Sequence, residues 1–396
     1  MDISLESFRA NRVAQFMEGN HLDLLVASNP EHILYLLNFT ILGQTYQART
    51  QNYAVVSAHS DVKRLVISPS DAPTAVDFSR EVELVCHGSF HFDFCQPYDA
   101  FSTRLQSQIG QRQSSPAQAL IEAIRRFGGK KLRIGIDELR TPVTTWNLVA
   151  AAFPDAELVP ALSIFEQIRC VKHPEEIAQI EKSTHIAEDS LLAALDSVHL
   201  GSSEYEIGMN YRTEVAKRNA HGYFCTCTID KRTAFSDTCH KKDVTVQQDS
   251  LLRFDYGANY DFYRSDLART VVFGNASEEI KMRYAAILAG LEAAEAAMKP
   301  GVLACEVFHT AMAAVKEHGI PHYERHHCGH GIGLQIYDPP SVSASCTQPL
   351  EEGMVLCIET PYYEIGKYGI QIEDTVAVTA NGIRRLTHTS NDLIYL

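Results

Sequence analysis

Five side chains in the C-terminal half of the sequence have the chemistry of a shared metal site. Four are carboxylates and one is an imidazole: Asp255, Asp266, His330, Glu359 and Glu373. Each lies in a strand-like or glycine-rich run, where an uncompensated charge is costly to bury. Divalent cations supply the compensation, and an oxygen-rich set with one histidine suits Mn²⁺, Fe²⁺, Co²⁺ or Zn²⁺ and accommodates two ions.

The local sequence indicates how these side chains could meet. Asp255 and Asp266 are 11 residues apart, and two strands joined across a turn would bring them to one sheet face. Glu359 ends the apolar run 355–358, and His330 lies among glycines that let the backbone approach a ligand closely. Taken singly, each acid is more simply a solvated residue at a strand end. Taken together, the five favour a metal centre.

The composition is that of a globular protein with an acidic excess. The chain has 396 residues, of which 45% are hydrophobic, and its 35 basic and 49 acidic residues give 35 − 49 = −14. The hydrophobic fraction excludes wholesale disorder, and the negative charge argues against nucleic acid or an anionic membrane surface as the main partner. We find no signal-peptide pattern and no apolar run of about 18 residues. Ten scattered cysteines favour reduced thiols and a cytoplasmic location.

The pattern of elements changes near residue 170, which divides the chain into an expected first domain, 1–168, and an expected second domain, 169–396. Strand and helix signals alternate in the first domain, which predicts an α/β fold with a mixed or parallel sheet. Its expected strands are 22–27, 53–57, 64–68 and 132–136, and its expected helices include 8–17 and 119–127.

Long helices and strand-rich runs follow in the second domain, which predicts an α+β fold with helices packed on one curved antiparallel sheet. A helix start is expected at 172–176, where a proline and two acids occupy the first turn. Further helices are expected at 278–299 and 303–318, and strands at 224–229, 251–256, 268–273, 354–360 and 370–379.

Four sequence strings carry a resemblance to a known family. They are DYG followed by SDLART, HHCGHGIGLQIYDPP, EEGMVLCIETPYY and GIQIEDTVAVTANGIRRLT, in this order. They resemble the pita-bread metallopeptidases, a family that includes Xaa-Pro dipeptidases and aminopeptidases, methionine aminopeptidases and creatinase. The run NPEHILYL resembles part of the first domain of the prolidase and creatinase branch. The resemblance implies a C-terminal pita-bread domain preceded by a creatinase-like α/β domain.

The resemblance also implies roles for the five candidate ligands. Asp255 would bind one metal ion, Asp266 and Glu373 would bridge two ions, and His330 and Glu359 would bind the second. Of the possible ions, Mn²⁺ is the one we expect first. Glu359 is also the expected catalytic proton carrier between the attacking water and the leaving nitrogen.

Four further positions bear on the substrate. His240 and His326 match family histidines that bind substrate or stabilise the oxyanion, although an ordinary loop or surface histidine is the alternative for both. Tyr337 stands where prolidases commonly have histidine, and Gln371 stands where many Xaa-Pro peptidases have arginine. We expect both to contact substrate. Because neither a phenol nor an amide is positively charged near neutral pH, these departures weaken the case for an ordinary Xaa-Pro peptide.

These features predict a metallohydrolase that cleaves an amide C–N bond with water activated between two metal ions, in the manner of Xaa-Pro dipeptidases and aminopeptidases. The alternative is a specialised hydrolase of a non-peptide C–N bond, similar to ectoine hydrolase or creatinase, or a lyase acting on a small polar metabolite. A non-catalytic binding module is disfavoured because all five ligand positions are filled.

The resemblance further implies a homodimer that acts on a dipeptide or a small molecule. In such a dimer, the aromatic segment 87–98 could line the active-site entrance. A plain core segment is the more common role of such a run, and we expect it here.

Overall fold

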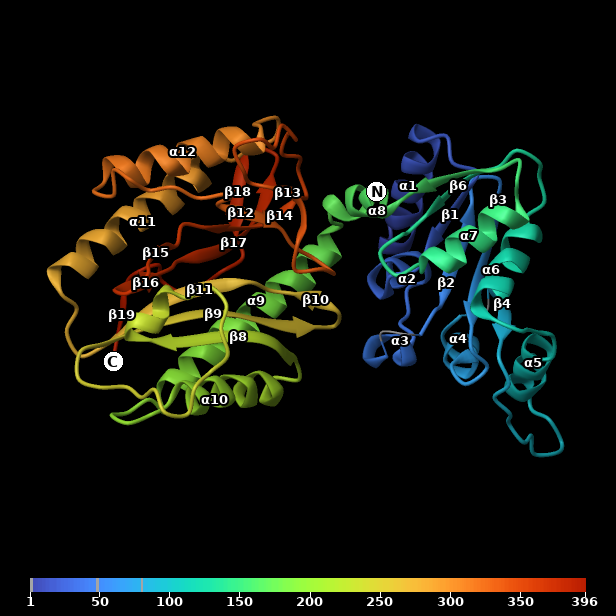
Figure 1. Ribbon diagram of the computed structural model, residues 1–396, viewed down its shortest axis with the longest axis horizontal. Coiled ribbons are helices and arrows are strands. Elements are labelled where there is room, and N and C mark those ends of the chain that lie inside the picture. Colours follow the sequence, from blue (N-terminus) through green and yellow to red (C-terminus); the bar gives the residue numbers. More distant parts are fainter. Residues whose placement is uncertain (1–2, 48–49, 80) are drawn as a thin grey trace. The chain divides into compact units, whose positions relative to one another are not determined.

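The computed structural model of the protein describes residues 3–47, 50–79 and 81–396. The chain forms two compact units, Met1–Ile168 and Arg169–Leu396, each built around its own sheet (Figure 1). Helix α8 (Leu162–Cys170) contains the boundary between them.

A seven-stranded mixed sheet forms the centre of the first unit. Its strands are β1 (Leu24–Ala27), β2 (Tyr53–Ser57), β3 (Ser60–Ile67), β4 (Val82–His87), β5 (Arg112–Gln113), β6 (Arg133–Ile136) and β7 (Glu157–Pro160). The helices are α1 (Leu5–Gly19), α2 (Pro30–Leu37), α3 (Leu42–Tyr46), α4 (Ala72–Phe78), α5 (Ala100–Ile109), α6 (Pro116–Arg125) and α7 (Val143–Ala152). The strand order is β5-β4-β3-β2-β1-β6-β7. The pairs of β2 with β1 and β3 are antiparallel and the others parallel, as the alternating sequence predicted.

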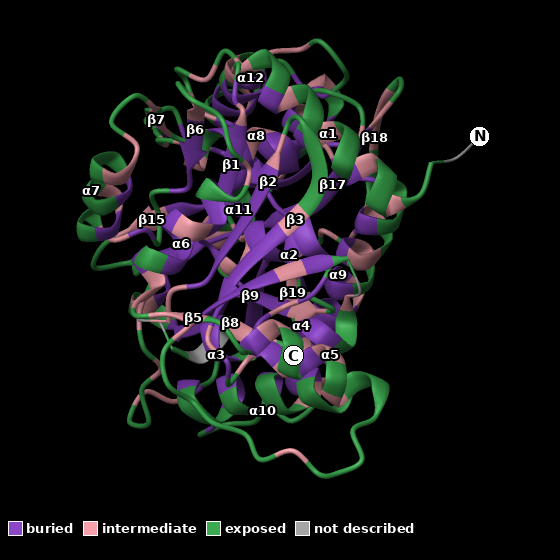
Figure 2. Cartoon of the chain, turned by 90° about the vertical axis from the view of Figure 1, so that its right-hand side faces the viewer, coloured by how far each residue is buried: buried purple, intermediate pink, exposed green. Residues whose placement is uncertain are grey.

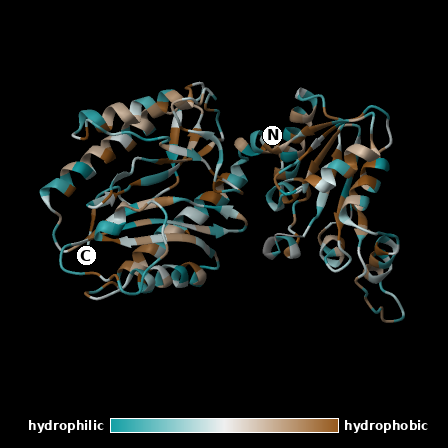
Figure 3. Ribbon diagram, in the orientation of Figure 1, coloured by the Kyte–Doolittle hydropathy of each residue, from teal (hydrophilic) through white to brown (hydrophobic). Residues whose placement is uncertain are grey.

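Hydrophobic residues concentrate in the strands of this sheet (Figure 3). The aromatic segment 87–98 is different, and the expectation that it belongs to a core is wrong. Phe90, Phe92 and Tyr98 are 50%, 36% and 38% exposed. The segment leaves the sheet as irregular chain between β4 and α5, so its rings pack on one another, as Phe90 does on Phe92 with 5.0 Å between ring centroids.

The second unit is built on a ten-stranded sheet. Its strands are β8 (His221–Ile229), β9 (Ser250–Tyr260), β10 (Tyr263–Arg264), β11 (Leu267–Phe273), β12 (Gly329–Gly331), β13 (Asp338–Ser341), β14 (Val355–Glu359), β17 (Glu373–Thr379), β18 (Gly382–Arg385) and β19 (Ile394–Tyr395). A separate hairpin pairs β15 (Tyr362–Glu364) with β16 (Tyr368–Ile370). The main path runs β10-β9-β11-β17-β14-β12-β13, and its pairs are antiparallel, as predicted.

Helices cover this sheet: α9 (Pro174–Leu195), α10 (Glu204–Lys217), α11 (Glu278–Ala297) and α12 (Ala304–Glu317), with a short 3₁₀ helix η1 (Asp230–Ala234). Helix α9 begins where the sequence predicted. The side chain of His173 accepts the Glu175 N–H, and the Glu176 carboxylate accepts the His173 N–H, which completes a capping box. Helices α11 and α12 share an apolar core with β14 and β17, and strands such as β9 are largely buried (Figure 2).

The second unit contains elements that were not predicted, among them β12, β13, β18 and β19, and two further differences have a local explanation. The sequence analysis did not predict helix α10, although Ser203 and Glu206 form a capping box at its N-terminus, which is a recognisable sequence signal. The predicted strand 370–379 is divided between β16 and β17. At the division, the backbone N–H of Gln371 donates to the side-chain hydroxyl of Thr270 on β11, and its C=O accepts from the same hydroxyl. These bonds take the place of backbone pairing and end the ladder there.

Candidate metal centre

Three of the predicted ligands form a row across neighbouring strands of the ten-stranded sheet. Asp255 of β9 is opposite Ala268 of β11, and Ala268 is in turn opposite Glu373 of β17. Glu373 is opposite Glu359, the last residue of β14. Because residues paired across strands point to the same face of a sheet, the three carboxylates share one face.

Asp266 and His330 complete the group. Asp266 precedes Ala268 by two residues, which directs it to the same face of the sheet. The Nε2 atom of His330 lies 3.5 Å from Oδ2 of Asp266. One potential ligand atom from each of Asp266, His330 and Glu373 lies within 4.8 Å of the others, and all three residues are buried.

A glycine allows β12 to bring His330 this close to β14. Gly329 has φ +148°, and a β-carbon at this position would lie 2.2 Å from the carbonyl oxygen of Cys357. Any larger residue would therefore push β12 away from β14. The glycine-rich run of the sequence thus has a steric reason at the position next to the histidine.

Burial and mutual repulsion make the cluster unfavourable as a set of anions. Burial raises the pKa of Asp255 to about 7, with repulsion from Asp266 as a further cause. Burial also raises the pKa values of Asp266 and Glu359, and that of Glu373 well above its usual value. Burial alone would lower the pKa of His330, but the adjacent Asp266 carboxylate outweighs it and raises that pKa.

The residues present fit divalent cations. The Oδ1 atom of Asp266 is buried and has no hydrogen-bond partner in the part of the chain that the structure describes. A buried acceptor without a partner is costly, and a cation beside it would remove that cost. Four carboxylates and one imidazole form an oxygen-rich donor set that suits Mn²⁺ and related ions.

Gln371 links two of the carboxylates. Its Nε2 donates to Oδ2 of Asp255 at 3.1 Å and to Oε2 of Glu359 at 3.2 Å. Its Oε1 accepts from Nη1 of Arg253 at 2.6 Å and from the hydroxyl of Tyr363 at 3.0 Å. Because Gln371 is only 1% exposed, its amide is held in a fixed position and orients the two carboxylates through these hydrogen bonds. The sequence did not indicate this role.

Arg253 is a buried cation that the sequence analysis missed. Its guanidinium donates to the backbone carbonyls of Thr233, Phe235 and Ser236. Its Nη1 lies 3.6 Å from Oδ2 of Asp255. The signal was available, because residues two apart on a strand share a face and Arg253 precedes Asp255 by two.

A second missed residue approaches Glu359 from the segment before β12. The Nδ1 atom of His327 lies 3.3 Å from Oε1 of Glu359, and Nη2 of Arg325 lies 4.0 Å from the same oxygen. The predicted His326 is exposed, and its ring packs edge-on against His327 with 4.2 Å between centroids. Two consecutive histidines in the sequence do not reveal which of them faces inward.

The two other residues predicted to act on the substrate, Tyr337 and His240, lie in different surroundings. Tyr337 is 60% exposed, and its ring lies 4.1 Å from that of His330, so it borders the cluster. His240 accepts a hydrogen bond at 3.0 Å from the backbone N–H of Cys227, and its ring covers Gly208 of α10. The contacts of His240 therefore run to β8 and α10, and burial lowers its pKa.

Comparison with known families agrees with this geometry. The model of Metallopeptidase family M24 matches residues 178–380, and the Creatinase/Prolidase N-terminal domain matches residues 9–171. The chain belongs to metallopeptidase family M24. This membership confirms three predictions from the sequence: the pita-bread fold, the N-terminal creatinase-type domain and the assignment as a metallohydrolase. The family also implies divalent metal ions.

Several similar proteins are named as Xaa-Pro dipeptidases or prolidases. The Xaa-Pro dipeptidase of Pyrococcus furiosus is 33% identical over 233 residues, which cover 58% of this chain and 67% of that protein. The Xaa-Pro dipeptidase of Lactobacillus helveticus is 30% identical over 281 residues, 70% of this chain and 76% of its own. The solved prolidase of Pyrococcus furiosus has a TM-score of 0.77 and 26% identity over 95% of this chain and 99% of its own. None of the helices that the structure describes is long and apolar enough to cross a membrane.

Proposed function

We propose that the chain hydrolyses the amide bond of Xaa-Pro dipeptides, using two divalent ions held by the five clustered residues, with Mn²⁺ as the first expectation. Two observations carry this proposal. Asp255, Glu373 and Glu359 lie in one row across the sheet. Asp266, His330 and Glu373 bring ligand atoms within 4.8 Å of one another. Bound there, the ions supply a polarised substrate carbonyl and an acidified water.

Glu359 moves the proton in this proposal. Burial raises its pKa, which brings a carboxylate closer to the range where it can both accept and donate a proton. Gln371 holds its Oε2 atom, and His327 lies 3.3 Å from its Oε1 atom. Burial lowers the pKa of His327 to about 4, so near neutral pH its imidazole is uncharged. It can then hydrogen-bond to Glu359 without adding a positive charge that would repel the metal ions.

Arg325 is the group that we assign to the substrate carboxylate. It lines a cavity of about 500 Å³ together with Arg283, His322 and Tyr362 among others. Its Nη2 atom lies 4.0 Å from Oε1 of Glu359, which connects this cavity to the cluster. Its side chain is 14% exposed, and its buried Nε has no hydrogen-bond partner in the described residues. A largely buried cation with an unpaired donor gains most from an anionic ligand. The free C-terminal carboxylate of a dipeptide has this chemistry.

The test compares Ala-Pro with Ala-Pro amide as substrates of the Mn²⁺-reconstituted protein. We expect Arg325→Met to raise KM for Ala-Pro by about tenfold or more, because a charge-assisted hydrogen bond is lost. KM for the amide should change little. Arg125→Met serves as the matched control, since Arg125 is 60% exposed and belongs to the first unit. Equal KM values for Arg325→Met and the unchanged chain would contradict the assignment.

A second candidate is a hydrolase of a small non-peptide C–N compound. It is favoured by the neutral groups Tyr337 and Gln371, where Xaa-Pro peptidases commonly have cations. Ectoine and creatine, offered to the same metal-loaded protein with release of the amine product measured, distinguish the two. Turnover of either compound in place of Ala-Pro would favour the second candidate.

A further inference from the structure

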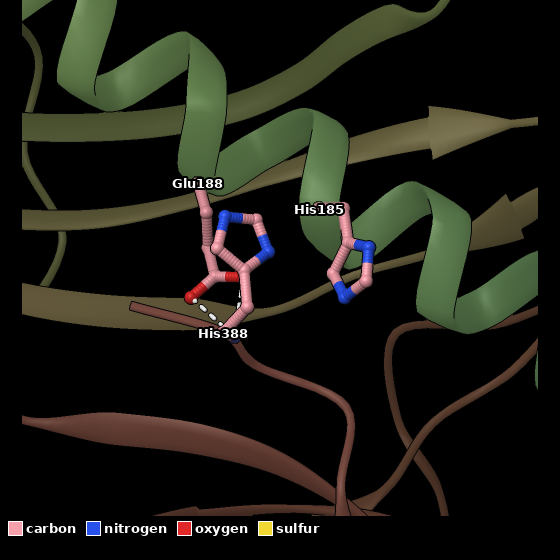
Figure 4. A group of neighbouring side chains, drawn as sticks. All are labelled: His185, Glu188 and His388. Atoms are coloured by element: carbon pink, nitrogen blue, oxygen red, sulfur yellow. Dashed lines mark hydrogen bonds and ion pairs between the residues drawn. The ribbon is translucent and has the colours of Figure 1, made fainter. Parts of the chain in front are cut away.

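A second group of potential metal ligands lies outside the carboxylate row. His185 and Glu188 are three residues apart on α9, which places them on one face of the helix. His388, in the segment between β18 and β19, lies against them (Figure 4). One ligand atom from each of the three lies within 4.8 Å of the others, and the two imidazole rings are 4.5 Å apart.

The two nitrogens of His388 face two different carboxylates. Its Nδ1 lies 3.1 Å from Oε2 of Glu188, and its Nε2 lies 3.1 Å from Oδ1 of Asp189. If Asp189 accepts the Nε2 proton, a neutral ring presents the lone pair of Nδ1 to the carboxylate of Glu188, and two acceptors then face each other. Either a second proton or a cation resolves this contact. A carboxylate that holds the outer nitrogen of a histidine is the usual support of a metal-binding imidazole.

Glu188 is fixed in place before any ligand arrives. It is buried, and its carboxylate accepts the backbone N–H groups of His388 and Thr389 at 3.0 Å and 2.9 Å. The buried Arg269 lies 3.8 Å from Oε1 of Glu188 and donates to the backbone carbonyl of Glu373 at 2.7 Å. The cluster is therefore preorganised, and it is connected through one arginine to the strand that carries a predicted catalytic ligand.

We propose that His185, Glu188 and His388 form a separate binding site for a Zn²⁺-type cation, which fastens the segment before β19 to α9. Two imidazoles and one carboxylate match the ligands of Zn²⁺, whereas the oxygen-rich carboxylate row suits Mn²⁺. Around one tetrahedral zinc ion with bonds of about 2.0–2.1 Å, ligand atoms lie roughly 3.3 Å apart. The 3.1 Å between His388 Nδ1 and Glu188 Oε2 is close to this value.

The site is tested by metal content. The full chain, His388→Gln, His185→Gln and the control His309→Gln are equilibrated with Zn²⁺, dialysed and analysed by inductively coupled plasma mass spectrometry. His309 is exposed on α12, away from both groups. We expect the unchanged chain and the control to carry one more zinc ion per chain than either cluster variant. Two variants are included so that one that fails to fold, as judged by circular dichroism, does not decide the result.

A spectroscopic measurement identifies the ligands independently of activity. Among their predicted ligands, the five-residue cluster around Glu373 offers one imidazole, and the proposed site offers two. Loaded with Cu²⁺, the unchanged chain should show an electron paramagnetic resonance component with coupling to two nitrogens, and His388→Gln should lose it. Equal zinc content in all four proteins, or the absence of the two-nitrogen component from the unchanged chain, would overturn the proposal.

Discussion

The metal-free protein should become less stable as pH rises, and Asp255 should be a main cause. The pKa of Asp255 is raised from 3.8 to about 7 in the folded chain, chiefly by burial. A group with a raised folded-state pKa contributes stability below its unfolded pKa and loses it as pH rises through the folded value. From about pH 5 the loss continues over roughly two pH units, up to the folded-state pKa, and it levels off by about pH 9. It amounts to about 3 kcal/mol of unfolding free energy.

The perturbation is Asp255→Asn, which removes this titration and keeps the size of the side chain. Metal is removed from the unchanged chain and from the variant with a chelator, and the thermal unfolding of both is followed by calorimetry over the pH range. The variant should gain stability relative to the unchanged chain as pH rises, by roughly 5–10 °C in Tm for a unit of this size. Saturating Mn²⁺ should abolish the pH trend of the unchanged chain. A difference in Tm that stays flat, or that narrows with rising pH, would refute the reasoning.

Four further substitutions test the network around the cluster. Gln371→Leu removes the side-chain acceptor of the buried Arg253 Nη1, so it should destabilise the chain by about 1–3 kcal/mol in urea unfolding and also weaken Mn²⁺ binding in calorimetric titration. In steady-state assays, His327→Ala should lower kcat by about tenfold or more, and His326→Ala should have the smaller effect. The reverse order would contradict the assignment of His327 as the histidine that faces Glu359. Gly257→Ala places a β-carbon 2.1 Å from a neighbouring backbone carbonyl, so it should cost about 1–3 kcal/mol of stability by the same urea assay, and an unchanged midpoint would contradict it.

The strands that carry the cluster could be predicted because their apolar runs are local features of the sequence. The expected strand 251–256 lies within β9, and 268–273 lies within β11. The sequence also indicates one shared face, since a carboxylate that ends an apolar strand is out of place without a partner. The register that sets Asp255 opposite Ala268 is a long-range property and emerged only with the folded sheet.

The supporting residues were harder to predict for physical reasons. Gln371 was expected at the substrate, but its backbone leaves the ladder and its amide turns beneath the carboxylates. The face on which Arg253 lies could be predicted from its position two residues before Asp255, but the carbonyls that accept its hydrogen bonds are brought in only by η1 and the residues after it. The inward-facing member of the pair His326 and His327 depends on backbone direction, which two identical residue types do not encode.

The account rests on two divalent ions in the cluster of Asp255, Asp266, His330, Glu359 and Glu373. The most direct measurement is the electron paramagnetic resonance spectrum and metal content of the Mn²⁺-reconstituted chain. The account predicts two Mn²⁺ ions per chain with the spectrum of a coupled pair, and the loss of that coupling in Glu373→Gln. A single uncoupled Mn²⁺ ion per chain, or a coupled pair that persists in Glu373→Gln, would contradict it.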